Sequence, residues 1–141
     1  MKRLLLPLLL ALLLGGCTAY NAQVERGRSL AGVQRFFVLA NANDSRGLEH
    51  RLVAALRARG LTAEAGPRTM MPDDTQAVVT YQDHWAWDFG DHLVHLQVSV
   101  RDALSSQPYA IASFSAKIPG RQKPAAIVDG VVAELLAGKK P

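Results

Sequence analysis

The chain has 141 residues, of which 49% are hydrophobic and 20% charged, and its formal net charge is +4 at pH 7. This length suits one domain with a modest core. The arginines are scattered and are not interleaved with aromatic residues, which excludes the basic footprint that nucleic-acid binding requires.

Residues 1–16 are typical of an export signal. Lys2 and Arg3 form a positive start, and Leu4 to Leu14 form an apolar run interrupted only by Pro7. A membrane-spanning helix needs about 20 apolar residues, so this run is too short to be one. Removing Lys2 and Arg3 from the 16 basic residues leaves 14, against 12 acidic residues, in the rest of the chain.

Cys17 is the only cysteine of the chain, so it cannot form an internal disulfide. The stretch Leu14-Gly15-Gly16-Cys17 resembles a bacterial lipobox, which implies that Cys17 is acylated and holds the protein on a membrane. Two or more acyl chains anchor a protein stably. In such lipoproteins an aspartate after the cysteine retains the protein at the inner membrane. Thr18 stands there instead, which favours the outer membrane with the domain facing the periplasm.

The rest of the chain divides into a polar tether over residues 17–32 and a single domain over residues 33–141. Polar residues without a clean period predict the tether. The expected elements of the domain, in chain order, are a strand over 33–40, a helix that Asp44 or Ser45 caps and that stops at Gly60, strands over 61–65, 76–87, 92–102 and 109–117, and a closing helix from Pro124 to Gly138.

This order predicts an α+β fold. Both helices have one apolar stripe, so each needs a sheet face to cover. The economical arrangement is a two-layer sandwich, in which a mixed, mostly antiparallel sheet of about five strands carries both helices on one face. The connectivity is β-α-β-β-β-α.

The stretch 84–95, HWAWDFGDHLVH, predicts the tip of a hairpin with a turn over Asp88 to Asp91. In that register His84 lies opposite His95 and Trp85 opposite Val94, because a one-residue slip would mix apolar with polar side chains on each face. Asp83 is the misfit, either a buried hydrogen-bonded carboxylate or a residue at a bulge. The helix-side face is predicted to hold Val79, Tyr81, Trp85, Trp87, Val94, Leu96, Val98 and Val100. The opposite, polar face holds Gln82, His84, Leu93, His95, Gln97 and Arg101, among others.

A second hairpin, with a loop centred on Ser106, continues the apolar face onto the next strand. Its inward residues are Ala110, Ala112, Phe114 and Ala116. Small alanines there leave room for a helix to pack closely.

The whole organisation resembles that of small bacterial envelope lipoproteins. It has a lipobox, a strand-helix-strand unit whose helix ends at Leu52 to Gly60, a meander and a final helix. Accessory lipoproteins of lipopolysaccharide assembly and of secretion systems, and the amino-terminal domain of the Tol translocation protein, are similar in this respect. The resemblance implies a non-enzymatic envelope role with a protein partner and no cofactor.

Two functions are compatible with the residues. In the first, a lipid-anchored interaction module binds an envelope protein through Gln82, His84, His95, Gln97 and Arg101, or through a sheet edge. In the second, a metal- or small-ligand-binding protein, with hydrolysis as one option, uses His84, His92, His95 and Asp91. Two facing imidazoles fall short of the three or four protein ligands of a zinc site, so no metal site is predicted.

Overall fold

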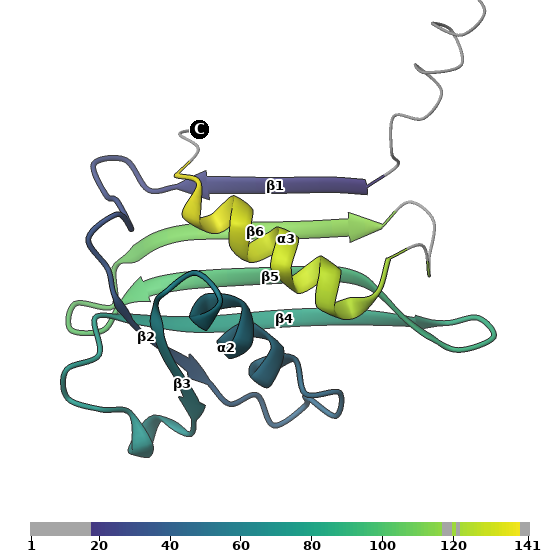
Figure 1. The fold of residues 1–141 in the computed structure, drawn as a ribbon, viewed down its shortest axis with the longest axis horizontal. Helices are drawn as coiled ribbons and strands as arrows, with labels where there is room; N and C mark the ends of the chain where they lie inside the picture. The colour runs from purple at the N-terminus through teal and green to yellow at the C-terminus, as the bar shows by residue number, and fades with distance from the viewer. Residues whose placement is uncertain (1–17, 117–119, 121, 139–141) are drawn as a thin grey trace, which may run out of the picture.

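A mixed sheet of six strands with two helices packed on one face makes up this protein (Figure 1). The computed structural model describes residues 18–116, 120 and 122–138, so the predicted signal and Cys17 lie outside the described residues. The elements are β1 Thr18–Val24, β2 Arg35–Leu39, α2 Leu48–Arg57, β3 Thr62–Gly66, the 3-10 turn η1 Arg68–Met70, β4 Ala77–Trp87, β5 Asp91–Asp102, β6 Pro108–Ala116 and α3 Pro124–Leu136.

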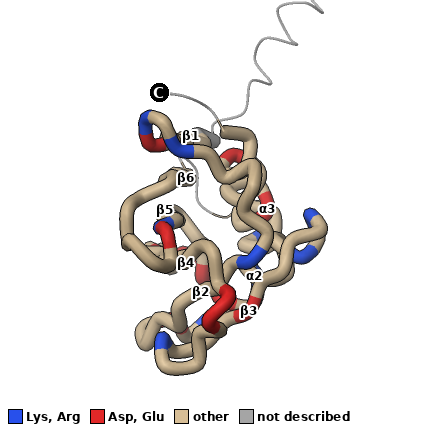
Figure 2. Tube along the Cα trace, turned by 90° about the vertical axis from the view of Figure 1, so that its left-hand side faces the viewer, with Lys and Arg blue, Asp and Glu red and all other residues tan. Residues whose placement is uncertain are grey.

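The strand order is β1-β6-β5-β4-β2-β3, in which β2 runs parallel to both β3 and β4 and the other pairs are antiparallel. The side view in Figure 2 separates the two layers, with α2 and α3 on the same side of the sheet. The predicted α+β sandwich is therefore confirmed, with six strands where about five were expected.

The core lies between the two layers. Leu48, Leu52 and Leu56 of α2 are 0–1% exposed, as the helical spacing predicts. The buried residues of α3 are Ile127, Val128, Val131, Val132 and Leu135, and they pack over Leu96, Val98, Val100, Ala110, Ala112 and Phe114 of the sheet. Within the described residues, no helix combines the length and the hydrophobicity that a membrane span requires.

The β4–β5 hairpin follows the predicted register from Ala77↔Asp102 to His84↔His95 and then departs from it. Trp85 lies opposite Leu93, not Val94, because Val94 is an extra residue at a bulge. Leu93, predicted on the polar face, is consequently 2% exposed in the core. The strands end at Trp87 and Asp91, so the turn has three residues instead of the expected four.

The β5–β6 hairpin keeps the predicted inward face with a different centre. Leu96 pairs with Phe114 and Val100 with Ala110, which centres the loop on Ser105 and not on Ser106. Moving the loop centre by one residue shifts the partner of every β5 residue by two positions along β6. Because side chains alternate with a period of two, the same ones still face the helices.

Residues 18–24, which fall in the predicted tether, form the edge strand β1. Every residue from Thr18 to Val24 pairs with β6, so this part of the tether prediction is wrong. The sequence feature that predicts β1 is the alternation of Tyr20, Ala22 and Val24 with polar residues. These three side chains pack on the core.

Tyr20 joins β1 to the last helix. Its side chain lies so close to Gly130 in α3 that a Cβ at position 130 would stand 2.7 Å from two ring carbons and from the hydroxyl oxygen. The ring also lies 5.1 Å from that of Phe114, and the Tyr20 hydroxyl donates a hydrogen bond of 2.9 Å to Gln122 Oε1. Burial, with the Asp129 charge adding to it, raises the pKa of Tyr20, so the hydroxyl remains a donor.

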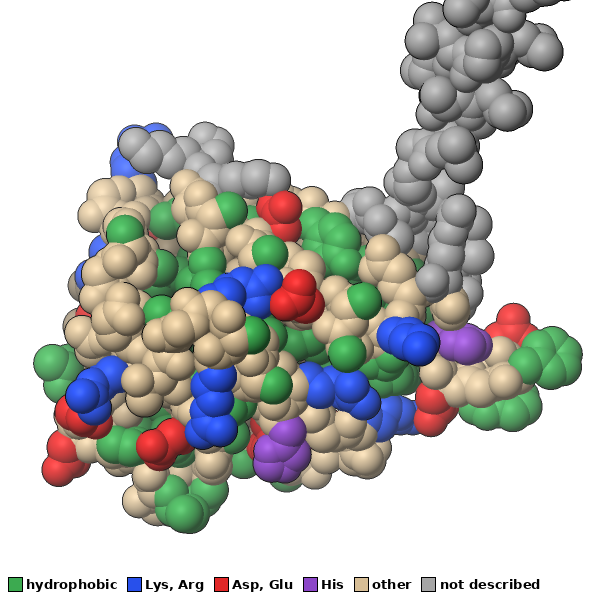
Figure 3. Space-filling model, viewed as in Figure 1, with side chains coloured by type: hydrophobic (Ala, Val, Ile, Leu, Met, Phe, Trp, Pro, Cys, Tyr) green, Lys and Arg blue, Asp and Glu red, His purple; other side chains and the backbone are tan. Residues whose placement is uncertain are grey.

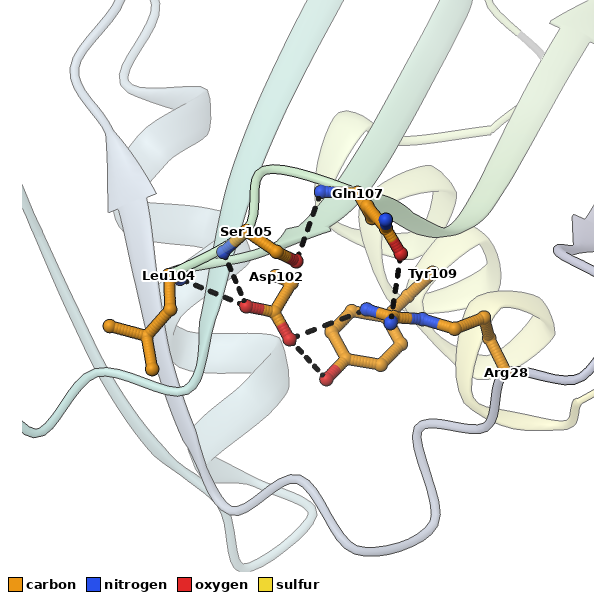
Figure 4. A network of polar contacts seen from close by, with 6 residues as sticks. All are labelled: Arg28, Asp102, Leu104, Ser105, Gln107 and Tyr109. Atoms are coloured by element: carbon orange, nitrogen blue, oxygen red, sulfur yellow. Dashed lines mark hydrogen bonds and ion pairs between the residues drawn. The ribbon is translucent and has the colours of Figure 1, made fainter.

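A polar network fixes the segment after β1 at the opposite end of the sheet (Figure 4). Asp102 Oδ2 accepts hydrogen bonds from the Tyr109 hydroxyl at 2.9 Å and from Arg28 Nη2 at 3.3 Å. Its Oδ1 accepts from the backbone N–H groups of Ser105 and Leu104. The Ser105 N–H, the Tyr109 hydroxyl and the Leu104 N–H hold the pKa of Asp102 well below its usual range. The Arg28 guanidinium also lies 4.2 Å from the ring centre of Tyr109.

Replacing Gly130 with alanine should destabilise the protein, although alanine is the better helix former by about 1 kcal/mol. The added methyl group collides with Tyr20, and overpacking of this kind costs about 1–3 kcal/mol. Urea unfolding measures the change. In a Tyr20→Ala background the same substitution should become neutral or stabilising, and equal losses in both backgrounds would contradict the contact.

Candidate functional site on the polar sheet face and the projecting hairpin

The five residues predicted to bind a partner share the sheet face that lies opposite the helices. Gln82 pairs with Gln97 and His84 with His95, while Arg101 pairs with Val78 farther along the same two strands. Gln82, His84 and Arg101 are exposed, and His95 and Gln97 are half-buried.

This polar face continues across two more strands. Gln97 lies opposite Ser113, and Ser113 opposite Asn21 of β1. His95 Nδ1 and Ser115 Oγ are 3.0 Å apart and share a hydrogen bond. The result is a broad face of amide, imidazole and hydroxyl groups that neither helix covers.

The histidines do not assemble a metal centre within the described residues. No group of three or more His, Cys, Asp or Glu side chains is placed there to hold an ion. His84 and His95 face each other, but Nδ1 of His95 is engaged with Ser115. His92 Nε2 lies 2.9 Å from the carbonyl oxygen of Asp88, within its own hairpin. The structure thus supplies a pair of imidazoles without a third ligand.

Asp83, the misfit on the helix-side face, has a structural role at the bulge. Its Oδ2 accepts a hydrogen bond of 2.6 Å from Trp85 Nε1, and the register shift follows between His84 and Trp85. The first expectation is met except for full burial, because Asp83 is hydrogen-bonded but half-buried. Asp83 itself pairs regularly with Leu96, so the bulge lies beside it and does not include it. Trp85 packs partly buried against the core, as predicted.

Arg46 braces the base of the hairpin from the loop before α2. Its Nη2 lies 3.0 Å from Asp91 Oδ2, and its guanidinium lies 4.6 Å from the ring centre of Trp85. A cation over an indole face and an ion pair on the same arginine fix both strands to the body of the domain.

Asp44 holds the Arg46 loop in place. Its Oδ2 accepts a hydrogen bond from the Tyr81 hydroxyl at 2.7 Å and from Glu49 N at 3.1 Å, and its Oδ1 accepts from Arg46 N at 2.9 Å. Asp44 thus caps α2 from outside the helix, because the N-cap position itself is Gly47. Burial acts to raise the pKa of Asp44, but these hydrogen bonds outweigh it and lower the pKa.

The tip of the hairpin exposes two aromatic side chains. Trp87, predicted on the helix-side face, is 78% exposed, and Phe89 in the turn is 100% exposed. Strands β4 and β5 extend beyond the helices, so no helix is left to cover Trp87 (Figure 1). The exposure of Trp87 could have been predicted from the strand lengths, because β4 and β5 are longer than β6 and must extend beyond it.

A cleft of about 610 Å³ opens at the other end of the sheet, between the segment after β1 and the end of α3. Its lining includes Arg28, Leu30, Leu135 and Leu136. The histidines lie at the hairpin end, so the cleft and the imidazoles do not form one site.

No protein-family model matches this chain, and no curated protein matches it. Among solved structures, two dodecamers of PelC from Paraburkholderia phytofirmans, one of them a leucine-to-methionine variant, are similar with a TM-score of 0.64. Their identities are 12% and 14%, and each match covers 84% of this chain and 98% of the PelC chain. A minor lipoprotein from Acinetobacter baumannii matches with a TM-score of 0.37 and 13% identity over 72% of this chain and 87% of that one. The PelC match establishes a shared fold.

Replacing Asp44 with asparagine should destabilise the protein at neutral pH and matter less in acid. A carboxyl whose pKa is lowered on folding contributes stability above its unfolded pKa of about 3.9, and this stability is lost as the pH falls through the folded pKa. Urea unfolding of both proteins between pH 7 and pH 2 checks this.

The gap between the native protein and Asp44→Asn should be constant above about pH 5 and shrink below about pH 4. Tyr81→Phe removes one donor to the carboxylate and should reproduce part of this dependence. A gap that stays the same across the whole range would contradict the role given to Asp44.

Proposed function

We propose that this protein is a lipid-anchored bacterial envelope lipoprotein whose domain acts as a non-enzymatic interaction module. The lipobox Leu14-Gly15-Gly16-Cys17 supports the anchor, and Thr18 after the cysteine supports the outer membrane with the domain in the periplasm.

The observation that carries the interaction role is the uncovered polar face of the sheet. Both helices pack on the other face, so Gln82, His84 and Arg101 remain exposed on a broad surface that spans β4, β5, β6 and β1. Such a surface offers many donors and acceptors and little apolar area. Protein contacts use hydrogen bonds of this kind to fix register and specificity.

The first partner that we propose is a further copy of the chain itself. PelC, whose fold this chain shares over nearly the full length of PelC, is a dodecamer in both crystal structures. A protein held on a membrane meets its own copies in one plane and one orientation, which favours a closed ring over an open filament. A different envelope protein is the alternative occupant of the same face.

Acylation of Cys17 can be tested separately from binding. The full chain, produced in a Gram-negative host fed with an alkyne-bearing palmitate analogue, should become labelled, and Cys17→Ser should lose the label. Thr18→Ser, which leaves the cysteine in place, is the matched control. Equal labelling of the native chain and Cys17→Ser would overturn the anchor.

A photo-crosslinking residue placed at His84 or at Arg101 tests the partner-binding face in cells. We expect an adduct of twice the mass of the chain from both positions. Ala54, exposed on α2, is the control position and should give none.

Adducts with a different envelope protein would show that this protein, and not a second copy of the chain, binds the polar face. The polar face would be excluded if His84 and Arg101 gave no adduct, or only those that Ala54 gives.

A further inference from the structure

The tip of the β4–β5 hairpin carries apolar side chains that nothing in the described part of the chain covers. Trp87 and Phe89 stand at the end of an overhang, and Figure 3 shows hydrophobic atoms there beside acidic ones. Arg46 and Trp85 stiffen the base of the overhang, so the tip is held out at a fixed place.

The backbone at the tip is unfavourable for the residue it carries. Phe89 has φ 55°, in the left-handed region that a bulky side chain rarely adopts, and Gly90 follows with φ 145°. A fully exposed ring gains no packing inside the molecule in return. Strain that the fold itself does not compensate points to a contact outside the molecule.

The start of β1 lies at the same end of the sheet as this tip. Thr18 pairs with Ala116, and the neighbouring Ser115 pairs with His95, which faces His84. The first residue of β1 is thus nearly level with the histidine pair, and in Figure 1 β1 begins on the side to which the hairpin projects. The peptide bond places the Cα of Cys17 about 3.8 Å from that of Thr18.

The hairpin reaches farther than the anchored residue. Trp87 comes three residues after His84, a rise of about 10 Å along the strand. Strand β4, which carries Trp87, lies three strand positions from β1, or about 14 Å across the sheet. Acyl chains on Cys17 and the ring of Trp87 would therefore meet the same membrane surface. Because β1 is hydrogen-bonded into the sheet, no tether separates the domain from that surface.

We propose that the aromatic tip of the β4–β5 hairpin inserts into the interface of the membrane that the Cys17 lipid occupies, which rests on the proposed lipid anchor. Tryptophan and phenylalanine suit this layer, since a ring enters the acyl boundary while the indole N–H and nearby polar groups stay among the headgroups. Asp88 and Asp91 flank the rings and limit how deep the tip can go. Lipid and tip together make two contacts that fix the orientation of the domain.

The experiment places the acylated protein in phosphatidylcholine vesicles, with or without bromine atoms on the acyl chains. Bromine quenches tryptophan only within the bilayer, and the chain holds only Trp85 and Trp87. We expect a loss of emission in brominated vesicles that largely disappears in Trp87→Phe. Phe89→Gly, which suits the left-handed backbone, should fold normally and show weaker quenching of Trp87.

The matched control places a tryptophan at the other end of the sheet. Leu104, in the β5–β6 turn, is 93% exposed, so Leu104→Trp in the Trp87→Phe chain should show no added quenching. Quenching of that reporter equal to that of Trp87 would overturn the orientation. Unquenched Trp87 in an acylated, vesicle-bound protein would overturn the inserted tip and leave the anchor standing. If Trp87 is unquenched and a photo-crosslinker at position 89 forms an adduct with a protein, the tip binds a protein partner and not the membrane.

A chain that is not acylated would contradict the proposed function but would still allow the tip to be tested. The core residues lie between Val24 and Leu135, so a chain that begins at Cys17 contains all of them. Its single thiol couples to a maleimide lipid in the same vesicles and tethers the domain to the bilayer through the same residue. Quenching of Trp87 there supports the tip, and its absence overturns it.

Discussion

The contact between the Tyr20 ring and Gly130 is the constraint on which the place of β1 in the fold depends. A glycine within a helix is unfavourable, but here it lets an aromatic ring of the first strand approach the backbone of the last helix. That contact, with the hydrogen bond to Gln122, holds β1 at the edge of the sheet. The described fold therefore begins one residue after Cys17, and a lipid on that cysteine, as proposed, would orient the domain through the direction of β1.

The two ends of the sheet are built for different tasks. At one end, the carboxylate of Asp102 joins Arg28, Tyr109 and the β5–β6 turn into a closed network (Figure 4). At the other, the polar groups of Asp44 and Arg46 stop at the base of the β4–β5 hairpin and leave its tip free. The Asp102 carboxylate is hydrogen-bonded within its own end of the sheet, whereas Trp87 and Phe89 beyond Arg46 are exposed apolar side chains of the kind found at interaction sites.

The fold gives the domain three separate surfaces. The helix layer covers the core, the opposite sheet face presents hydrogen-bonding side chains, and the hairpin tip presents aromatic rings. The lateral contact that we propose for the polar face and the membrane contact that we propose for the tip would not compete, because they involve different residues. The fold shared with PelC comes with only 12% identity, and a shared fold does not by itself determine function.

The sequence by itself determined the helices, the five strands of the domain between residues 33 and 117, and the register of β4 with β5 as far as His84. Apolar periodicity encodes these features locally and leaves one way to bury each face. The tertiary structure alone decided the rest. Strand β1 owes its place to Tyr20 and Gly130, which are 110 positions apart in the chain. Trp87 is exposed because the hairpin extends beyond the helix layer, and Leu93 is buried because the Val94 bulge shifts the pairing. Each of these depends on which distant segment lies against a residue, and no local pattern contains that information.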